Sequence, residues 1–580
     1  MRKITVVVLM LFTALSYAQD IKLNGTVSAQ NNQIKNVANP TEAQDAVTKS
    51  FMETLIADLQ AQIEEINLNI DNDEDGYTEN QGDCDDTNAS INSSAGELEG
   101  DGIDNDCDGE IDEYDGENGI SIFDPNPDVF VNPVSNESEL ELMLSNAQEL
   151  LTSYSFLILT SEIASDNSLK GGESANDLLG LYNIENFTHT ASNYPVKEIW
   201  DFMYAGYNRA SYAYLKGREI SNVSQSYLAE ALFLKSFYAY NLVEWFGNYL
   251  QIFEYDPNNS PILNGNNGNT RNELLEQIAA DLEYAISISE NFGVTSSGRS
   301  IITKNAMLAY LSKTFAKLGN NSAAINRIDQ IIASGQHSLA TNYETVFDDQ
   351  PSISSVFDID CTDAFGASFA CILCSQGNIM VGFNGIRNYV GPIYNSGFSF
   401  NIPTNESYNS FESGDIRRDV AILDIVAWAE ATGATYAEGF QHTGFFNNKY
   451  LPVQGNTRAG DINLTNPNDI KVVRYAELLL LRSELSLRSG DYSEALRYLN
   501  LVRTRAGLSN ISNSNNLMND IIQERRSEFM GEGKRFFDLV HFGIATQNLP
   551  NFIYGRNEVF PIPQYFIDLV GGLIPQNPGY

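Results

Sequence analysis

The stretch AELLLLRSELSLRSGDYSEALRYLNLVRTRAGL, residues 476–508, determines the expected fold class. Its apolar residues recur every three or four positions, which is the period of one face of an α-helix. Gly490 interrupts this pattern after an apolar helix, and Ala495 places a small residue in the helix that follows. Glycine often ends a helix, so the stretch predicts two helices joined by a short turn.

A second stretch, residues 304–334, repeats this arrangement with Gly-Asn-Asn between two helical patterns. Such helix–turn–helix pairs are typical of tetratricopeptide-like repeats. Repeats of this kind stack because each pair must cover the apolar face of its neighbour, and the stacks serve as scaffolds that bind other proteins.

Periodic patterns predict helices along most of the chain after a short linker at residues 116–133. Two segments rich in Gly and Asn, residues 258–269 and 293–300, indicate loops, and strand patterns are few and short. We therefore expect a mostly α fold with long loops. Its further helix candidates are residues 137–151, 194–215, 225–246, 271–290, 304–318 and 323–334.

The protein has 580 residues, with 34 Lys and Arg against 76 Asp and Glu, and a formal net charge of -42. This charge opposes binding to nucleic acids or anionic lipids, which attract basic proteins. Hydrophobic residues make up 43% of the chain, so most of it is expected to fold. The length favours a large body with accessory segments.

The acid is concentrated in residues 71–115, which hold 18 Asp or Glu and no Lys or Arg. Two D-x-D-x-D-G patterns occur here, and carboxylates at alternate positions before a glycine suit calcium, which takes six to eight oxygen ligands. The alternative is a solvated acidic linker. The predicted calcium ligands are Asp71, Asp73, Asp75, Asp83, Asp85, Asp104, Asp106, Asp108, Asp112 and Asp115.

The five cysteines fall into two groups. Cys84 and Cys107 lie in the acidic segment, where a disulfide would stabilise a small module that has little core. The second group, Cys361, Cys371 and Cys374, lies in one loop-rich region. A disulfide between two of these cysteines is expected to hold the loop together, and the third is left unpaired or forms a bridge elsewhere. A zinc or redox role for them lacks a second ligand pair at metal spacing.

The amino terminus has the features of an export signal at residues 1–18. Its apolar run of 12 residues is shorter than the ~20 that a spanning helix needs. Residues 41–70 then predict a helix whose apolar residues have the heptad spacing of a coiled-coil seam. Isoleucine occurs at both apolar positions of the heptad, which favours a trimer or tetramer. A lone amphipathic helix docked on the body would show a similar stripe. The seam residues are Met52, Ile56, Leu59, Ile63, Ile66 and Ile70.

No catalytic motif is present in the sequence. The four histidines are scattered, and H-E-x-x-H, G-x-S-x-G, the P-loop and G-x-G-x-x-G are all missing. We therefore expect no enzyme. A glycosidase, whose two carboxylates need no fixed spacing in the sequence, stays as a minor alternative.

Several stretches resemble the SusD/RagB family, the nutrient-binding outer-membrane proteins of Bacteroidetes. They are WDFMYAGYNRASYAYL (200–215), YLAEALFLKSFYAYNLVEWFGNYLQIF (227–253), the stretch 472–508, IIQERRSEFMGEGKRFFDLVHFG (521–543), and the ending with FPIPQYFID and QNPGY. The resemblance implies a helical scaffold with tetratricopeptide-like pairs, capped by loops that bind a glycan or a peptide. It also implies a SusC-like TonB-dependent channel as partner.

Family members build their ligand surface from loops, which here suggests residues 166–187 and 360–394. The candidate ligand-binding residues are Tyr182, Tyr389 and Tyr394, because the flat faces of aromatic rings stack on sugars. For each of them, ordinary packing against the rest of the protein is the alternative. The charged residues of 521–543 instead suggest an ion-pair network between helices. These charges are Glu524, Arg525, Glu528, Glu532, Arg535 and Asp538.

The amino-terminal segments differ from the family pattern. The acidic segment resembles metal-binding repeats of the MopE and thrombospondin type 3 kinds, and residues 31–52 resemble a repeat of phage tail fibres and bacterial surface fibres. The lipidation Cys that typically follows the signal is missing, so these segments are expected to act as a stalk. The expected order is signal peptide (1–18), fibre-like repeat and heptad helix (19–70), acidic module (71–116) and nutrient-binding domain (117–580).

The sequence thus predicts an exported protein at the cell outer membrane that binds oligomeric nutrient, a glycan more readily than a peptide, and delivers it to the SusC-like transporter. A surface adhesin or structural fibre component is the alternative. The predicted partners are the channel, the oligosaccharide or peptide ligand, and two further copies of the chain in a homotrimer.

Overall fold

The computed structural model divides the chain into two compact units, Met1–Glu117 and Asn118–Tyr580. In the second unit the structure describes residues 134–255, 261–263, 270–289, 300–347, 352–362, 375–455 and 463–580. In the first it describes residues 56–57, 59–60, 70–73, 77–78, 83–85, 87–88, 91 and 107. Most of the predicted heptad helix lies outside these residues. Residues 56, 57, 59 and 60 of it are helical, and the trimer stays a prediction.

The second unit is mostly helical, as predicted. Its helices are α3 (Glu137–Glu149), α4 (Tyr154–Ile163), α5 (Leu179–Glu185), α6 (Tyr194–Gly217), α7 (Gln225–Phe246), α8 (Arg271–Ile288), α9 (Lys304–Lys317), α10 (Asn321–Ser334), α11 (Met380–Asn384), α12 (Asn405–Asn409), α13 (Arg418–Ala421), α14 (Ile425–Thr432), α15 (Tyr475–Arg488), α16 (Tyr492–Arg505), α17 (Leu517–Glu528), α18 (Arg535–His541), α19 (Ala545–Asn548) and α20 (Gln564–Leu569), with short 3-10 helices η4 (Leu150–Ser153) and η5 (Glu344–Val346). α7 coincides with its prediction, and the other predicted helices differ by a residue or two at an end.

Local sequence explains where these helices begin and end. Thr270 and Glu273 form a reciprocal capping box at the start of α8, which satisfies two backbone donors. Between α15 and α16, Gly490 has a φ of +85°, a left-handed conformation that glycine adopts at little cost. Ala495 of α16 is fully buried, so the predicted helix pair is confirmed.

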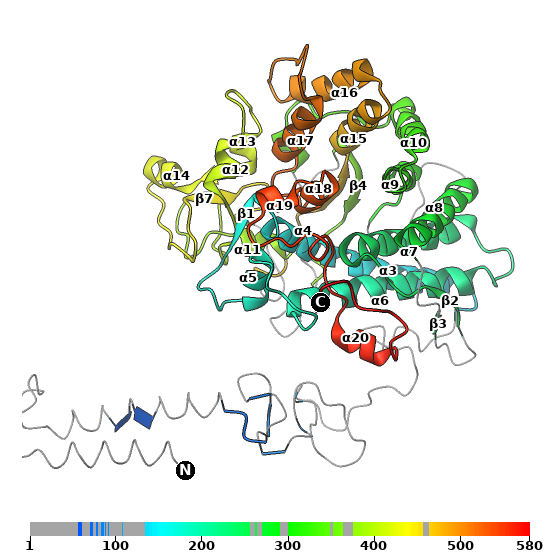
Figure 1. Ribbon diagram of the computed structural model, residues 1–580, viewed down its shortest axis with the longest axis horizontal. Coiled ribbons are helices and arrows are strands. Elements are labelled where there is room, and N and C mark those ends of the chain that lie inside the picture. The colour runs from blue at the N-terminus through cyan, green and yellow to red at the C-terminus, as the bar shows by residue number, and fades with distance from the viewer. Residues whose placement is uncertain are drawn as a thin grey trace, which may run out of the picture. The chain divides into compact units, whose positions relative to one another are not determined.

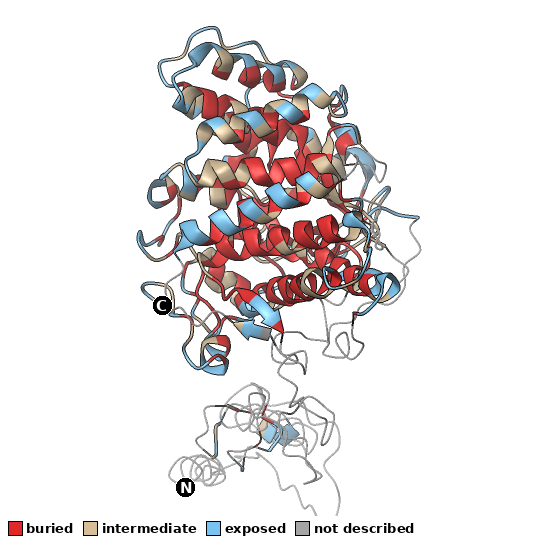
Figure 2. Cartoon of the chain, turned by 90° about the vertical axis from the view of Figure 1, so that its right-hand side faces the viewer, coloured by how far each residue is buried: buried red, intermediate tan, exposed pale blue. Residues whose placement is uncertain are grey.

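The longer helices form a continuous stack in which each one packs on the next. The order runs from α6 through α7, α8, α9 and α10 to α15, and α15 also packs on α16 and α17. Figure 1 shows this stack curving from the green helices to the orange ones. Figure 2 shows that buried residues line the inner sides of these helices and exposed residues their outer turns. Each pair therefore covers its neighbour, as tetratricopeptide-like packing requires.

The strands described here are short and pair two by two. They are β1 (Ser168–Gly171) with β5 (Phe400–Pro403), β2 (Ile252–Tyr255) with β3 (Pro261–Leu263), β4 (Ser355–Ile359) with β8 (Ile470–Arg474), and β6 (Ile422–Asp424) with β7 (Phe445–Asn447), all antiparallel.

Residues 385–455, which we call the side lobe, have a small core of their own. Figure 1 shows α12, α13, α14 and β7 of this lobe grouped on the side of the second unit opposite α8. The lobe core is separate from the large core of the helical stack. Its buried members are Ile386, Tyr389, Ile402, Leu423, Ile425, Ala434, Phe446 and Leu451. None of the helices in the described part of the chain is both long and apolar enough to cross a bilayer.

A buried ion-pair network centres on Glu528, at the end of α17. Its carboxylate accepts hydrogen bonds from Arg417 of the side lobe, Arg474 of β8 and Arg505 of α16, at 3.0, 2.7 and 2.6 Å. Burial alone would raise the pKa of Glu528, but these three guanidinium groups outweigh it and hold the pKa well below its usual range.

The network predicted from residues 521–543 is therefore present, and it extends further. Glu532 accepts from Lys449 of the side lobe and, at 2.7 Å, from Arg474. The remaining pairs are Glu524 with Arg417 and Arg503, Arg525 with Asp538, and Arg535 with Asp166, at distances of 2.7 to 3.1 Å.

Replacing Glu528 by Gln should destabilise the second unit strongly, by about 3–5 kcal/mol, because three buried guanidinium groups lose their shared counter-charge. The midpoint of urea unfolding, followed by Trp fluorescence, measures the effect, since all three tryptophans lie in this unit. Glu494→Gln is the matched control, because its partner Arg497 is half exposed and surface pairs contribute little. Equal midpoints for the two variants would contradict the central role of Glu528.

A second buried carboxylate, Glu230 of α7, makes stability depend on pH. Burial raises the pKa of Glu230 to about 8, although a hydrogen bond from Gln148 at 2.7 Å opposes the shift. Between pH 4.5 and 8 the folded protein holds a proton that the unfolded chain releases, so the free energy of unfolding falls as the pH rises. Glu230→Gln should flatten this fall, whereas Glu276→Gln on the exposed side of α8 should not. Urea unfolding at several pH values tests this, and an unchanged slope in Glu230→Gln would refute it.

Candidate functional site

The structure brings two of the three predicted ligand-binding tyrosines together. The rings of Tyr389 and Tyr394 meet edge to face in the side lobe, with centroids 6.0 Å apart. Tyr182 lies on α5, where its ring packs edge to face on Phe440 at 5.7 Å. Tyr182 therefore belongs to the contact between α5 and the side lobe, not to the Tyr389–Tyr394 pair.

Trp428 of α14 completes the pair and was missed by the sequence analysis. Its ring centroid lies 5.6 Å from that of Tyr394, and its Nε1 donates to the Tyr389 hydroxyl at 2.9 Å. The sequence did contain a signal that distinguishes Trp428 from the other two tryptophans. Trp200 and Trp245 lie in the long apolar helices of the stack and are 0% and 2% exposed, whereas Trp428 follows Asp424 in a short segment and is half-buried.

Local interactions position α14. Asp424 caps the helix, because its Oδ1 accepts from the amide of Ala427 at 2.9 Å. Gly433 ends the helix with a φ of +74°. Trp428 thus sits in the middle of a helix that is fixed at both ends.

Hydrogen bonds hold the two tyrosines as well. The Tyr389 hydroxyl donates to the carbonyl of Pro392 at 2.8 Å, and the Tyr394 hydroxyl donates to Asn448 Oδ1 at 3.0 Å. Gln454 Nε2 donates to the backbone carbonyl of Tyr394 at 3.0 Å. A surface whose rings are already ordered loses little conformational freedom when a ligand binds.

We call Tyr389, Tyr394, Trp428 and Tyr436 the aromatic platform. Tyr389 is 6% exposed, and the other three are half-buried and pack on the lobe core. Exposed apolar side chains accompany the platform along the lobe; these are Val390, Ile393, Val426 and Val453, at 71%, 50%, 47% and 41% exposure. Adjacent flat and apolar side chains at a surface indicate a binding site.

Burial raises the pKa of Tyr394 to about 12, and the neighbouring Tyr389 and Glu344 add to the effect. Its hydroxyl therefore stays protonated at any physiological pH. The platform offers flat apolar faces with fixed polar groups beside them. Such a surface can bind a ligand that has apolar faces and hydroxyl groups.

The scaffold itself contains a cavity of about 100 Å³, lined among others by Tyr154, Tyr240 and Trp245. Its charged groups neutralise one another in pairs. The pairs are Lys313 with Glu477, Lys317 with Glu244, and Arg525 with Asp538, at 2.7 to 3.0 Å, and Nε2 of His541 lies 2.7 Å from the Glu484 carboxylate. Burial would raise the pKa of Glu477, but Lys313, Lys534 and Arg525 lower it to about 2. These charges stabilise the scaffold, so we regard the platform as the better candidate.

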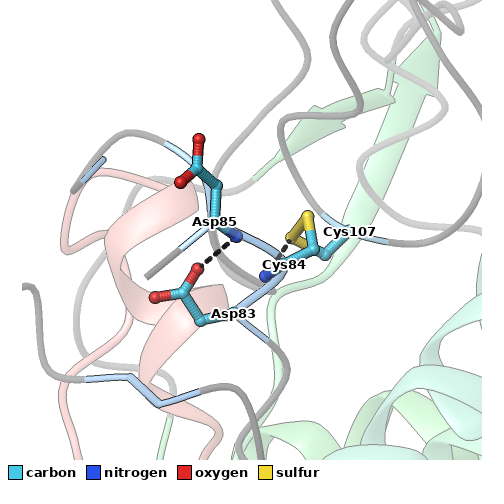
Figure 3. The surroundings of a disulfide bond; sticks show 4 residues. All are labelled: Asp83, Cys84, Asp85 and Cys107. Atoms are coloured by element: carbon cyan, nitrogen blue, oxygen red, sulfur yellow. Dashed lines mark hydrogen bonds between the residues drawn. A yellow bond between two sulfur atoms is a disulfide. The ribbon is translucent and has the colours of Figure 1, made fainter. Parts of the chain in front are cut away.

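In the first unit a disulfide joins Cys84 to Cys107, with the Cα atoms 5.6 Å apart (Figure 3). The neighbouring Asp83 is 3% exposed, and its Oδ1 accepts from the amide of Asp85 at 2.9 Å. Asp85 accepts in turn from the Thr87 hydroxyl at 2.6 Å. Asp83 is thus a buried carboxylate in a tight turn, whereas Asp85 is exposed, and carboxylate oxygens are the ligand type that a hard cation prefers.

Four predicted calcium ligands, Asp71, Asp73, Asp83 and Asp85, are among the described residues. Within that part of the chain, no group of three or more His, Cys, Asp or Glu is arranged to hold a metal. The other six lie outside the described residues, namely Asp75, Asp104, Asp106, Asp108, Asp112 and Asp115. Cys371 and Cys374 also lie outside them, while the amide of Cys361 donates to Asp469 at 3.1 Å.

Two family models match the chain. Residues 424–559 match the SusD family, and residues 83–113 match a family described as "Putative metal-binding motif", of the MopE kind. The first match includes Trp428, and the second includes Cys84 and Cys107.

Similar proteins match a larger share of the chain than the SusD family model does. "SusD-like protein P2" of Formosa agariphila is 27% identical over 68% of this chain and 83% of its own length. The structure of a "Laminarin binding SusD-like protein" is 29% identical, with a TM-score of 0.67 over 77% of this chain and all of that one. Surface glycan-binding protein A from Bacteroides thetaiotaomicron, solved in complex with laminarihexaose, is 25% identical, with a TM-score of 0.67 over 76% of this chain and 99% of that one.

The helices, their order and their stacking thus agree with these comparisons. The resemblance inferred from the sequence is confirmed: the helical body is similar to SusD-like proteins along most of their length, and residues 83–113 of the acidic segment match the MopE-type metal-binding motif.

Proposed function

We propose that this protein captures oligosaccharides at the outer surface of the cell, leaves them chemically unchanged, and delivers them to a SusC-like TonB-dependent transporter in the outer membrane. The observation that carries the proposal is the aromatic platform, in which Trp428 and Tyr394 lie half-exposed and are held in place by hydrogen bonds. Pyranose rings have an apolar face that stacks on such side chains.

The comparisons support a glycan as ligand more than a peptide. Two of the structures that this chain resembles are named for binding laminarin or hold laminarihexaose. The segment that matches the SusD family model, residues 424–559, includes Trp428 and Tyr436 of the platform. Capture without hydrolysis agrees with the sequence, which has no motif of a nucleophile and its base.

Delivery to a SusC-like channel rests on the family resemblance, and surface location rests on that resemblance together with the export signal at residues 1–18. We propose that the segments between the signal and residue 117 hold the body at a distance from its support. A trimer formed through the heptad seam would also hold the body at a distance from its support.

Trp428→Ala and Tyr394→Ala should each weaken binding of laminarihexaose at least about tenfold, because truncating a central aromatic anchor costs more than ~1.4 kcal/mol. Isothermal titration calorimetry against laminarihexaose, cellohexaose, maltohexaose and acidic hexasaccharides measures the affinities. Tyr284→Ala is the matched control, because Tyr284 is a half-exposed aromatic residue on α8 of the scaffold.

Two results would contradict the proposal. One is a folded wild-type protein that binds no oligosaccharide in the panel, which would favour the adhesin alternative. The other is shortening of a bound oligosaccharide, seen by mass spectrometry, which would make the protein a glycosidase. Unchanged affinity in both platform variants would show that the oligosaccharide binds elsewhere on the surface.

For the acidic module we propose calcium as the bound ion. Support comes from the match to the metal-binding motif at residues 83–113, from the two D-x-D-x-D-G patterns, and from the disulfide that closes the segment. The carboxylates would supply oxygen ligands, and the ion would stiffen the segment.

Calcium should bind the full-length protein, and replacing Asp104, Asp106 and Asp108 together by Asn should abolish or greatly weaken at least one site, because three carboxylate ligands lose their charge. Calorimetry with calcium chloride after chelation measures this, and limited proteolysis should show slower cleavage between residues 71 and 116 when calcium is present. Three Asp→Asn changes in the body, at Asp329, Asp491 and Asp568, provide the control. No heat of calcium binding, or a preference for copper, would refute calcium.

A further inference from the structure

The side lobe that carries the platform has an excess of acid. Residues 385–455 contain seven Asp or Glu and four Lys or Arg. The four cations are Arg387, Arg417, Arg418 and Lys449. Whether a charged ligand is attracted or repelled depends on how many of these positive charges remain available at the surface.

None of these four side chains presents an unpaired positive charge at the surface. Arg417 and Lys449 are buried in the ion-pair network, at 0% and 6% exposure. Arg387 pairs with the exposed Glu173 at 2.6 Å, and Arg418 pairs with the exposed Asp419 at 2.8 Å. Each positive charge of the lobe is therefore paired with a neighbouring carboxylate.

Carboxylates, in contrast, lie close to the platform. Asp424 caps α14 four residues before Trp428. Glu438 is an exposed residue two positions after Tyr436. Glu344 of η5 is exposed as well.

The field of these carboxylates reaches the platform hydroxyls. Burial raises the pKa of Tyr436, and the negative charges of Glu438 and Asp424 raise it further. Glu344 acts on Tyr394 in the same direction, after burial and Tyr389. These carboxylates therefore contribute negative charge near the platform, and the net charge of the whole chain is negative as well.

We propose that the platform selects uncharged oligosaccharides and excludes anionic ones, such as uronates and sulfated sugars, and that Glu344, Asp424 and Glu438 produce this selection. The inference rests on the proposed function, since it concerns the ligand class of the same site. A negative rim disfavours an anionic partner without adding affinity for a neutral one, which is how like charges confer specificity.

The test compares two hexasaccharides that differ only in charge. One is laminarihexaose, and the other is laminarihexaose whose primary hydroxyls have been oxidised to carboxylates. At ~20 mM salt we expect the oxidised form to bind the full-length protein at least ~10-fold more weakly, and at ~0.5 M salt we expect the difference to shrink, because salt screens exposed charges.

A triple variant, Glu344→Gln/Asp424→Asn/Glu438→Gln, identifies the residues responsible. Asn keeps the capping role of Asp424, and all three changes conserve size. We expect binding of laminarihexaose to stay within ~2-fold of wild type and binding of the oxidised form to tighten by ~3-fold or more at low salt, since three repulsive charges are removed. The matched control is Glu149→Gln/Glu219→Gln/Glu276→Gln, which changes three exposed carboxylates of the scaffold.

The outcomes separate this inference from the proposed function. If the wild-type protein binds the oxidised form as tightly as the neutral form at low salt, or if only the acidic members of the oligosaccharide panel bind, charge exclusion is wrong while capture stands. An unchanged ratio in the triple variant would remove the three named carboxylates from the explanation. Binding of no oligosaccharide at all would overturn both proposals.

Discussion

The carboxylates of Glu528 and Glu532 join parts of the second unit that are distant in sequence. They bind Arg417 and Lys449 of the side lobe as well as Arg474 of β8. Removing charges from water is costly, and such a network is stable only when every charge has a partner. The lobe is therefore anchored at two points, and its orientation on the helical stack depends on these contacts. Asn448, which holds the Tyr394 hydroxyl, directly precedes Lys449, so the anchor and the platform are adjacent.

Aromatic residues serve two different purposes in this protein. In the stack, Trp200, Tyr204 and Phe566 pack against one another in the interior, where large rings bury much apolar area. In the lobe, rings of the same kind remain partly exposed because the small lobe core covers only one side of them. Hydrogen bonds from their polar ends replace the packing that they lack, as in the bond from Trp428 to Tyr389. The abundance of aromatics in the sequence reflects both roles.

Much of the fold could be predicted because helical periodicity is a local property, and helices such as α8 and α10 bury residues three or four positions apart along one face. The charges of 521–543 were also interpreted correctly as a network. The site was predicted only in part. Tyr389 and Tyr394 are close in sequence, but their contact with Trp428 depends on a turn of the lobe that no local pattern specifies. The pairing of β1 with β5, more than 200 residues apart, is likewise set by tertiary packing.

The separate core of the side lobe has a consequence for how such proteins diversify. Because the platform packs on its own small set of apolar residues, a substitution there changes few contacts of the helical stack. The rings of the platform and the exposed charges of the lobe can therefore be exchanged while the scaffold keeps its stability, provided that Arg417 and Lys449 remain in the buried network. The side chains that the lobe displays can thus change through a few substitutions while the helical stack stays folded.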